Sequence, residues 1–379
     1  MPPHLTRRNA LKAAALGATA LAALRAWPAR AQQWNPGGTI YNWRDATLSF
    51  NELYGNPPLL GRVHGASWIR MFAEPTPRSN SVGRAEWGFV MPIYRAVHGP
   101  AYDQRAQSTV WFETLEGRYV HSAYVVPSHE QFQEPVDDIG SGWWGEITVP
   151  HAWQFSNPRL NSWRWDYSWY MGFWGQVHRV VERAEDEEGR VWYRIEDDAE
   201  PNRRAWVQAR QVRRVAPEEL TPLSPEVQDK MVLVTLDNQV LTCFENGVPV
   251  FTTRIASGST FQDDQGRLHD FTTTEGDFRI ERKRPSRRMR GGDEFGLPYD
   301  VNGVPWCTYF GDSGAAIHGA YWHNNFGRKR SHGCLNVTPD AAKWIYRWTL
   351  PHLNYDEEYR RTSEDEPSTL IRIVQSAEG

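Results

Sequence analysis

The chain has 379 residues, of which 40% are hydrophobic and 23% are charged, and these averages are those of globular proteins, which excludes a disordered chain. Its length predicts two or three domains. The 42 basic and 46 acidic residues argue against nucleic acid as a partner. The aromatic content is high, with 19 Trp, 15 Tyr and 15 Phe. It suits small β-domains with compact cores and also carbohydrate-facing surfaces.

Residues 1–31 are predicted to be a targeting segment. They contain the pair Arg7-Arg8, a weakly apolar Ala-rich run over 13–24 and a small-x-small cleavage site at 29–31. This order resembles twin-arginine signal peptides, although Ala10 stands where Phe or Leu is usual, and it implies export of the folded protein to the periplasm or cell wall. The alternative is a surface helix with a chance Arg-Arg pair. Without this segment, 37 basic and 46 acidic residues remain, a net charge of −9.

No stretch after residue 31 is a candidate for crossing a membrane, and the apolar run inside the targeting segment is too short to do so. We therefore expect the mature protein to have no membrane span. Residues 32–57 are predicted to be a polar linker.

A diluted internal repeat follows the linker. Residues 58–127 and 144–216 each contain short strands separated by turn signals. Val110–Glu113 matches Val191–Arg194, and Tyr119–Val125 matches Trp206–Val212. Each repeat ends with an aromatic strand, a turn and a further strand. This closing pattern resembles that of bacterial SH3-like domains. The resemblance implies two small β-barrels.

The second repeat contains an aromatic insertion between Trp163 and Trp174. It could bind sugars or peptides. We favour a hydrophobic seam against a neighbouring domain, because a dense aromatic patch left open invites aggregation.

The chain changes character at a Pro-rich linker, residues 217–225. After it, strands are predicted at 231–234 and 239–244, followed by a turn into 248–256, which makes a β-meander. One helix is predicted from Pro339 to Trp348, with Thr338 as its cap, and a last strand at 370–374. Residues 226–379 are therefore predicted to be a mostly antiparallel β-domain with one packed helix.

Three cysteines, Cys243, Cys307 and Cys334, leave at least one free thiol in an exported protein. Cys243 and Cys307 lie in apolar, strand-like runs. We expect two buried structural thiols there, although a disulfide between them is an alternative.

The stretch most informative about chemistry joins His318-Gly319 to Ser331-His332-Gly333-Cys334-Leu335-Asn336. Only the thiolate of a cysteine attacks carbonyls well, and an imidazole can take its proton. His332 lies two positions from Cys334, and His318 can arrive from an adjacent strand of a β-hairpin. Backbone N–H groups near Gly333 and Cys334 could stabilise an oxyanion.

These residues allow two other interpretations. His318, His323, His332 and Cys334 could ligate zinc, but the sequence lacks the paired spacing of such sites, so no metal and no cofactor is predicted. Cys334 could also be a structural cysteine with satisfied histidine neighbours.

The motif resembles the signature of the L,D-transpeptidase catalytic domain (the YkuD-like domain), and Ala256-Ser257-Gly258 and the element from Thr273 to Phe278 resemble further marks of it, with Thr274 where Pro is usual. The resemblance covers about 225–379 and implies a β-sandwich. It makes Cys334 the nucleophile, His318 the general base and Gly319 the residue whose carbonyl orients His318. His332 and Gly333 would shape the thiol pocket and oxyanion hole. Substrate contacts are expected from four residues: Tyr309, Trp322, Ser331 and Asn336.

The same resemblance implies a reaction on peptidoglycan stem peptides, in which terminal D-Ala leaves, an acyl-enzyme forms on Cys334 and an amine of a second stem peptide resolves it as a 3→3 cross-link. Carbapenems are expected to acylate Cys334. An L,D-carboxypeptidase would use the same residues with water as acceptor. A wall-binding SH3-like protein without catalysis is a further alternative. A papain-like Cys–His endopeptidase is disfavoured because both histidines precede Cys334.

An arginine-rich segment runs from Arg279 to Arg290. It could attract anionic wall polymer or substrate carboxylates over the site. The interpretation favoured from sequence is a solvated hairpin or lid-like loop without a ligand.

Overall fold

The computed structural model describes residues 59–103, 108–163, 171–200, 202–311, 314–363 and 365–376. The predicted signal peptide (1–31) and linker (32–57) lie outside these ranges, as does much of the aromatic insertion (164–170). Over the described ranges, no helix is long and apolar enough to cross a membrane. The chain divides into two compact units. One holds the residues up to Gln131 with 149–151 and 322–324, and the other holds the rest.

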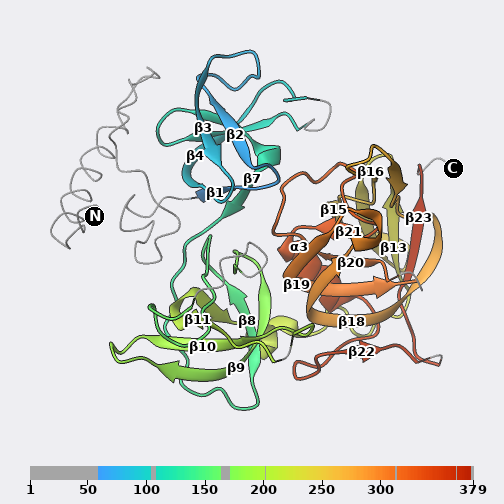
Figure 1. Cartoon of the computed structure of the whole chain (residues 1–379). Coiled ribbons are helices and arrows are strands. Elements are labelled where there is room, and N and C mark those ends of the chain that lie inside the picture. The colour runs from blue at the N-terminus through green and yellow to red at the C-terminus, as the bar shows by residue number, and fades with distance from the viewer. Residues whose placement is uncertain are drawn as a thin grey trace. The chain divides into compact units, whose positions relative to one another are not determined.

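In the described part of the first unit, seven strands form one sheet in the order β3-β2-β6-β5-β4-β1-β7 (Figure 1). Their bounds are β1 (Leu59–Val63), β2 (Trp68–Phe72), β3 (Ser81–Glu86), β4 (Val90–His98), β5 (Val110–Thr114), β6 (Tyr119–His121) and β7 (Val125–Ser128). Met71, Ile93 and Phe112 belong to its own hydrophobic cluster. Apolar residues alternate with exposed ones along β2, as expected for a sheet with one buried face.

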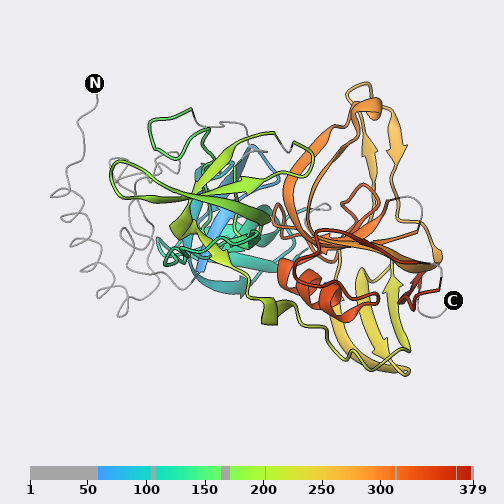
Figure 2. The same ribbon diagram turned by 90° about the horizontal axis from the view of Figure 1, so that it is seen from below.

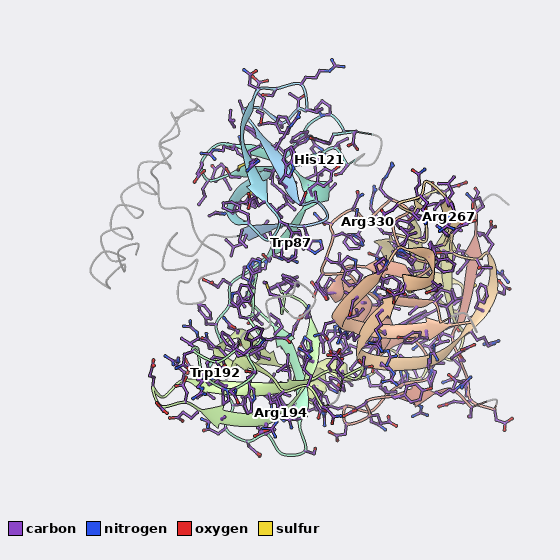
Figure 3. All side chains as sticks on the ribbon, in the orientation of Figure 1. Trp87, His121, Trp192, Arg194, Arg267 and Arg330 are labelled. Atoms are coloured by element: carbon purple, nitrogen blue, oxygen red, sulfur yellow. The ribbon has the colours of Figure 1, made fainter. Side chains whose placement is uncertain are left out.

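The second repeat lies in the second unit. Its described strands have the order β11-β10-β9-β8-β12, which is the order of β6-β5-β4-β1-β7 in the first repeat. Their bounds are β8 (Trp143–Ile147), β9 (Val177–Glu185), β10 (Val191–Glu196), β11 (Ala205–Gln208) and β12 (Val212–Arg214). In each repeat a three-residue 3₁₀ helix, η1 (Ser122–Tyr124) or η3 (Ala209–Gln211), precedes the closing strand. Trp192 (labelled in Figure 3) and Trp111, which the sequence aligns with it, are both fully buried. The internal repeat is therefore a repeat of topology.

The C-terminal region of the second unit is a sheet of nine strands within the described residues, in the order β15-β14-β13-β23-β18-β19-β20-β21 with β22 beside β18. These strands are β13 (Lys230–Thr235), β14 (Val240–Glu245), β15 (Val248–Arg254), β18 (Gly276–Gly291), β19 (Tyr299–Phe310), β20 (Ala316–Gly319), β21 (Leu335–Val337), β22 (Arg360–Arg361) and β23 (Leu370–Val374). A separate hairpin is formed by β16 (Thr260–Gln262) and β17 (Leu268–Asp270). The predicted meander and last strand are confirmed.

The predicted helix is α3 (Pro339–Trp348), and Thr338 caps it by accepting a hydrogen bond from the Ala341 N–H. Its apolar face packs on β19 and β20 (Figure 2), with Ile345 fully buried. The mostly β fold with a packed helix is confirmed. The three cysteines are all free, and Cys243 and Cys307 are buried structural thiols, as predicted.

The second repeat and the C-terminal region share one hydrophobic core. Trp144 and Val177 of the repeat cluster with Trp306 of β19. The Trp144 indole N–H donates to the Tyr355 carbonyl at 3.0 Å. Phe173 of the aromatic insertion is buried, which agrees with a packing seam, whereas Trp163 at its start is exposed. Part of this insertion therefore serves packing inside the second unit.

The Pro-rich segment after the second repeat is more ordered than a plain linker. Residues Pro217–Leu220 form a 3₁₀ turn, η4, although the prolines predicted no helix there. The Glu219 carboxylate accepts from the Ala216 N–H at 2.9 Å, and the Leu220 side chain joins the shared core. A capped turn with one buried side chain, that of Leu220, therefore orders the junction.

The arginine-rich strand β18 differs from the solvated hairpin favoured from sequence. The loop after β10 carries Asp197 and Asp198, which neutralise several of its charges. Asp197 pairs with Arg288 at 3.0 Å, and both side chains are almost fully buried. Asp198 pairs with Arg287 and accepts the Arg288 backbone N–H at 2.8 Å. Long-range partners that sequence spacing cannot indicate therefore bind these cations.

Lys283, in the same strand, is fully buried. Its ammonium donates to three carbonyls at the C-terminal end of α3, those of Tyr346, Thr349 (3.0 Å) and Pro351 (3.0 Å). The last carbonyls of a helix lack partners within the helix, and a cation there satisfies them. Lys283 thus links the C-terminal end of α3 to β18 through hydrogen bonds.

Candidate active site

Two adjacent short strands position the cysteine and the first histidine. β20 pairs with β21 in parallel, with Ile317 opposite Leu335 and His318 opposite Asn336. Cys334 directly precedes β21 and so lies beside Ala316. His318 does come from a neighbouring strand, but not through the predicted hairpin. Because the two strands are parallel, the chain from 320 to 334 must return to the starting end of the sheet.

The register determines which side chains share a face. Paired residues project to the same side of a sheet, and neighbours along a strand alternate. Ile317 and Leu335 therefore face the core under α3, where both are fully buried. Cys334 and His318 share the opposite face, one row apart.

His318 is held in one tautomer. Its Nδ1 lies 3.2 Å from the Gly319 carbonyl oxygen. A carbonyl can only accept, so Nδ1 carries the proton and Nε2 is the basic nitrogen. A Cβ on Gly319 would approach Pro305 Cγ to 2.7 Å and Pro339 Cα to 2.9 Å. The close packing around this backbone therefore requires glycine.

Burial makes both groups neutral at rest. Desolvation lowers the pKa of His318 to about 4, although the Gly319 carbonyl partly opposes it. Desolvation also raises the pKa of the Cys334 thiol, and a hydrogen bond from the Ala316 backbone N–H opposes that rise. The residue keeps partial exposure, while its thiol is screened by its neighbours. Burial therefore disfavours the imidazolium form of His318 and the thiolate form of Cys334.

The loop before Cys334 is held by its own hydrogen bonds. The Ser331 hydroxyl donates to the Cys334 carbonyl at 2.5 Å and accepts the Gly333 N–H at 3.2 Å. Gly333 has φ +107°, which side chains rarely adopt. Its carbonyl accepts from Thr273 Oγ1 at 3.0 Å, and that oxygen accepts the Gly258 N–H at 2.8 Å.

These bonds bear on two sequence expectations. Ser331 was expected at the substrate, but its hydroxyl is engaged within the loop. The Gly333 N–H was expected in an oxyanion hole, but it points to Ser331. The backbone N–H that faces the thiol belongs to Ala316.

His332 lies in an aromatic cluster rather than beside His318. Its ring stacks on Phe261 at 4.4 Å and 5°, and it lies 4.7 Å from Phe271 and 4.8 Å from Tyr299. Burial lowers its pKa. Phe261 comes from β16, and Tyr299 opens β19, so the cluster joins the β16–β17 hairpin, which carries Arg267 at its turn (Figure 3), to the β18–β19 hairpin. His332 thus shapes the wall of the site.

The remaining predicted residues have different environments. Asn336 is buried on β21, and its backbone exchanges hydrogen bonds with Ala256 at 2.8 and 3.0 Å. Tyr309 lies opposite Ala316 on the site face of β19. Trp322 belongs to residues 322–324, which group with the first unit.

Residues 229–363 match the family described as the L,D-transpeptidase catalytic domain (YkuD). This segment is an L,D-transpeptidase catalytic domain. The L,D-transpeptidase 2 of Mycobacterium tuberculosis (strain CDC 1551 / Oshkosh) is 28% identical to the chain over 123 residues, which are 30% of this chain and 29% of that protein. The match therefore spans less than a third of that relative.

Two solved structures are also similar. An L,D-transpeptidase from Mycobacterium smegmatis has 17% identity and a TM-score of 0.29, covering 67% of this chain and 92% of that one. The catalytic domain of the E. faecium L,D-transpeptidase acylated by ertapenem has 22% identity and a TM-score of 0.28, covering 38% of this chain and 97% of that one.

Sequence reasoning missed three features of the L,D-transpeptidase domain. The Ala316 N–H faces the thiol, Tyr299 packs on His332, and Arg282 lies over the Tyr309 ring, its guanidinium carbon 4.4 Å from the ring centroid. A backbone donor leaves no mark in a sequence, and the other two depend on strand register. Together the residues form a site with a screened thiol, an oriented base and an aromatic wall, which suits acyl transfer through a thioester.

Proposed function

We propose that the chain is a cysteine-dependent L,D-transpeptidase that forms 3→3 cross-links between peptidoglycan stem peptides. The observation that supports this most directly is that Cys334 and His318 share one face of two adjacent parallel strands, with His318 Nδ1 at 3.2 Å from the Gly319 carbonyl. A nucleophile, a base and a group that orients the base are the parts that covalent acyl transfer requires.

In the proposed acylation, the Cys334 proton moves to His318 Nε2 as the sulfur attacks the carbonyl of the third stem residue. The bond from that carbonyl to the D-Ala nitrogen breaks, and the proton passes to the departing amine. The Ala316 N–H, which faces Sγ, favours the thiolate while it exists. A thioester on Cys334 remains.

In the proposed deacylation, an amine of a second stem peptide attacks the thioester and gives its proton to His318, which returns it to the departing sulfur. The product is the 3→3 cross-link and the free thiol. If water replaces the amine, the same residues give an L,D-carboxypeptidase, which is the second candidate function. No cofactor enters either route.

The proposal extends to the rest of the chain. We infer that the two repeats are SH3-like wall-binding domains, because their closing strands, each preceded by a 3₁₀ helix, pair back to their first strands. We also infer export by the twin-arginine route, with cleavage after residue 31, to the periplasm or cell wall.

The test is mass spectrometry of disaccharide-tetrapeptide incubated with the mature protein, with Cys334→Ala and with His318→Gln. Loss of D-Ala together with dimers supports transpeptidation, and loss of D-Ala without dimers indicates carboxypeptidation. Cys334→Ala is expected to be inactive. His318→Gln is expected to lose about 10²- to 10⁴-fold in rate, the usual worth of a general base.

A carbapenem provides an independent probe of the nucleophile. Its mass is expected to add at Cys334 in the wild type and nowhere in Cys334→Ala. A wild-type protein that leaves the tetrapeptide intact and takes up no carbapenem would contradict the enzymatic proposal.

A further inference from the structure

A row of side chains crosses the four strands of the site face and ends at an arginine that the proposed mechanism does not use. Arg282 of β18 lies opposite Tyr309 of β19, and Tyr309 lies opposite Ala316 of β20. Ala316 in turn lies beside Cys334. Paired residues share a face, so Arg282 and Cys334 stand on the same side of the sheet.

The row has a defined span. Neighbouring strands lie about 4.8 Å apart, so roughly 14 Å separate the backbones of Arg282 and Cys334. The Arg282 guanidinium reaches inward over Tyr309, 4.4 Å from its ring centroid. That reach places the cation roughly 10 Å from the thiol's strand, two strand spacings away.

Tyr309 connects the two ends of the row. It is almost fully buried, and burial is the main cause that raises the pKa of its phenol. Cys334 raises this pKa further, whereas Arg282 lowers it, so the phenol lies within electrostatic range of both. The arginine and the nucleophile therefore lie on the same side of the sheet, at the two ends of this row.

Arg282 differs from four neighbouring basic residues of its strand. Protein acceptors engage its neighbours: Lys283 binds carbonyls, Arg284 and Arg287 bind Asp198, and Arg288 binds Asp197 and Asp300. In the described part of the chain, no carboxylate lies within ion-pair distance of Arg282, which is half-buried. Among the described residues, Arg282, the exposed Arg361 opposite it on β22 and the exposed Arg290 have no carboxylate partner, and of these three Arg282 belongs to the row that leads to Cys334.

We propose that Arg282 binds a free carboxylate of the peptide substrate, remote from the bond that Cys334 attacks. The inference rests on the proposed function and deepens it by naming a feature of the substrate. An extended peptide spans about 3.3–3.6 Å per residue, so a carboxylate roughly 10 Å from the scissile carbonyl is at most about three residues away and can belong to a side chain nearer to it. A guanidinium over an aromatic ring has its N–H fork free for a carboxylate at its edge.

The test compares two substrates with three proteins. The substrates are a disaccharide-tetrapeptide with free carboxylates and the same compound with the carboxylates remote from the scissile bond amidated. The proteins are the wild type, Arg282→Gln and Arg290→Gln. Arg290 is an exposed arginine of the same strand and serves as the matched control.

The wild type is expected to prefer the free-carboxylate substrate by about 10- to 100-fold in kcat/KM, the usual worth of a charge-assisted hydrogen bond. Arg282→Gln is expected to lose this preference, mainly through a higher KM, and to use the amidated substrate as the wild type does. Arg290→Gln is expected to behave as the wild type.

Two outcomes overturn the inference: an unchanged preference in Arg282→Gln, or an equal loss on both substrates, which would indicate a structural role. Carbapenem uptake at Cys334 separates this failure from that of the proposed function. A wild type that is acylated and consumes the tetrapeptide but ignores amidation contradicts only the role of Arg282.

Discussion

In the first repeat β5 and β6 are joined by the short segment 115–118, whereas in the second β10 and β11 are joined by 197–204. The strand order around these loops is the same. The longer loop brings Asp197 and Asp198 to β18, and Trp144 of β8 enters the core of the catalytic domain. Repetition of a fold therefore does not repeat its contacts: side chains of the second repeat belong to the core and the ion pairs of the C-terminal region.

Replacing one buried tryptophan in each repeat tests this difference and has the largest expected effect. Trp144 and Trp111 are both buried, and each indole donates to a carbonyl, that of Tyr355 at 3.0 Å or Pro100 at 2.8 Å. Each change to Ala is expected to cost about 3–5 kcal/mol of unfolding free energy. Only Trp144→Ala is expected to abolish carbapenem uptake at Cys334, as measured by mass spectrometry alongside thermal unfolding. Equal loss of uptake in both variants would contradict the comparison.

The acidic loop of the second repeat allows a finer test. Asp197 is buried between Arg203 (3.1 Å) and Arg288 (3.0 Å). Asp197→Asn removes the negative charge that faces these two buried arginines. Removing one partner of a buried ion pair lowers the free energy of unfolding by about 3–5 kcal/mol, and by less where other carboxylates remain. Since Asp300 also binds Arg288, we expect about 3 kcal/mol by denaturant unfolding.

The control for this variant is Glu182→Gln. Glu182 pairs with Arg194 of the same repeat (Figure 3) at 2.7 Å, but on the surface. The expected cost is below about 1 kcal/mol. If Asp197→Asn and Glu182→Gln lower the unfolding free energy by the same amount, the ion pairs of the loop do not stabilise β18.

These residues also mark what the sequence could and could not predict. The Cys334 motif, the capped helix from Pro339 and the aligned Trp111 and Trp192 are local patterns, and the structure contains the helix and the repeat as expected. The parallel pairing of β20 with β21 depends on where a long loop returns. Periodicity within a segment carries no information about that.

The arginine-rich strand shows the same limit. From sequence it was a solvated hairpin, because its partners Asp197 and Asp198 lie some ninety positions earlier in the chain. That Arg282 has no carboxylate partner among the described residues can be recognised only when the partners of its neighbours are known. A single sequence does not predict such contacts, because they depend on the register of strands that are distant in the chain.

Acid is expected to weaken the second unit through histidines of both its parts. Desolvation lowers the pKa of His178 in the second repeat, and of His318, to about 4. Unfolded imidazoles take up protons near pH 6.5, while the folded ones resist until about 4. The folded state binds fewer protons in between, so stability is complete above pH 6.5 and is lost as pH falls toward 4.

Each histidine is expected to contribute about 1–3 kcal/mol to this loss. Denaturant unfolding of the second unit between pH 7 and 4 measures it. In His178→Gln, the unfolding free energy is expected to fall less between pH 7 and pH 4 than in the wild type. Carbapenem uptake at pH 7 is expected to be unchanged. If the unfolding free energy of His178→Gln falls with pH as steeply as that of the wild type, His178 of the second repeat does not contribute to the loss of stability in acid.

The smallest expected effect concerns the junction between the second repeat and the catalytic domain. Burial alone would raise the pKa of Glu219, but hydrogen bonds from Arg213 and Lys343 outweigh it and lower the pKa to about 2. Because these side chains are partly exposed, Glu219→Gln is expected to cost only about 0.5–1 kcal/mol at pH 7.

The sign of its pH dependence follows from the lowered pKa. The stabilisation by Glu219 is present above pH 4.5, the usual value, and fades as pH falls toward 2, so wild type and Glu219→Gln should converge there. Glu218→Gln, an exposed neighbour, is the control and should match the wild type throughout. If the difference between wild type and Glu219→Gln persists at pH 2, Glu219 acts through the N–H of Ala216 and the shape of the turn. The junction would then be held by its backbone cap, and the ion pairs to β12 and α3 would contribute nothing measurable.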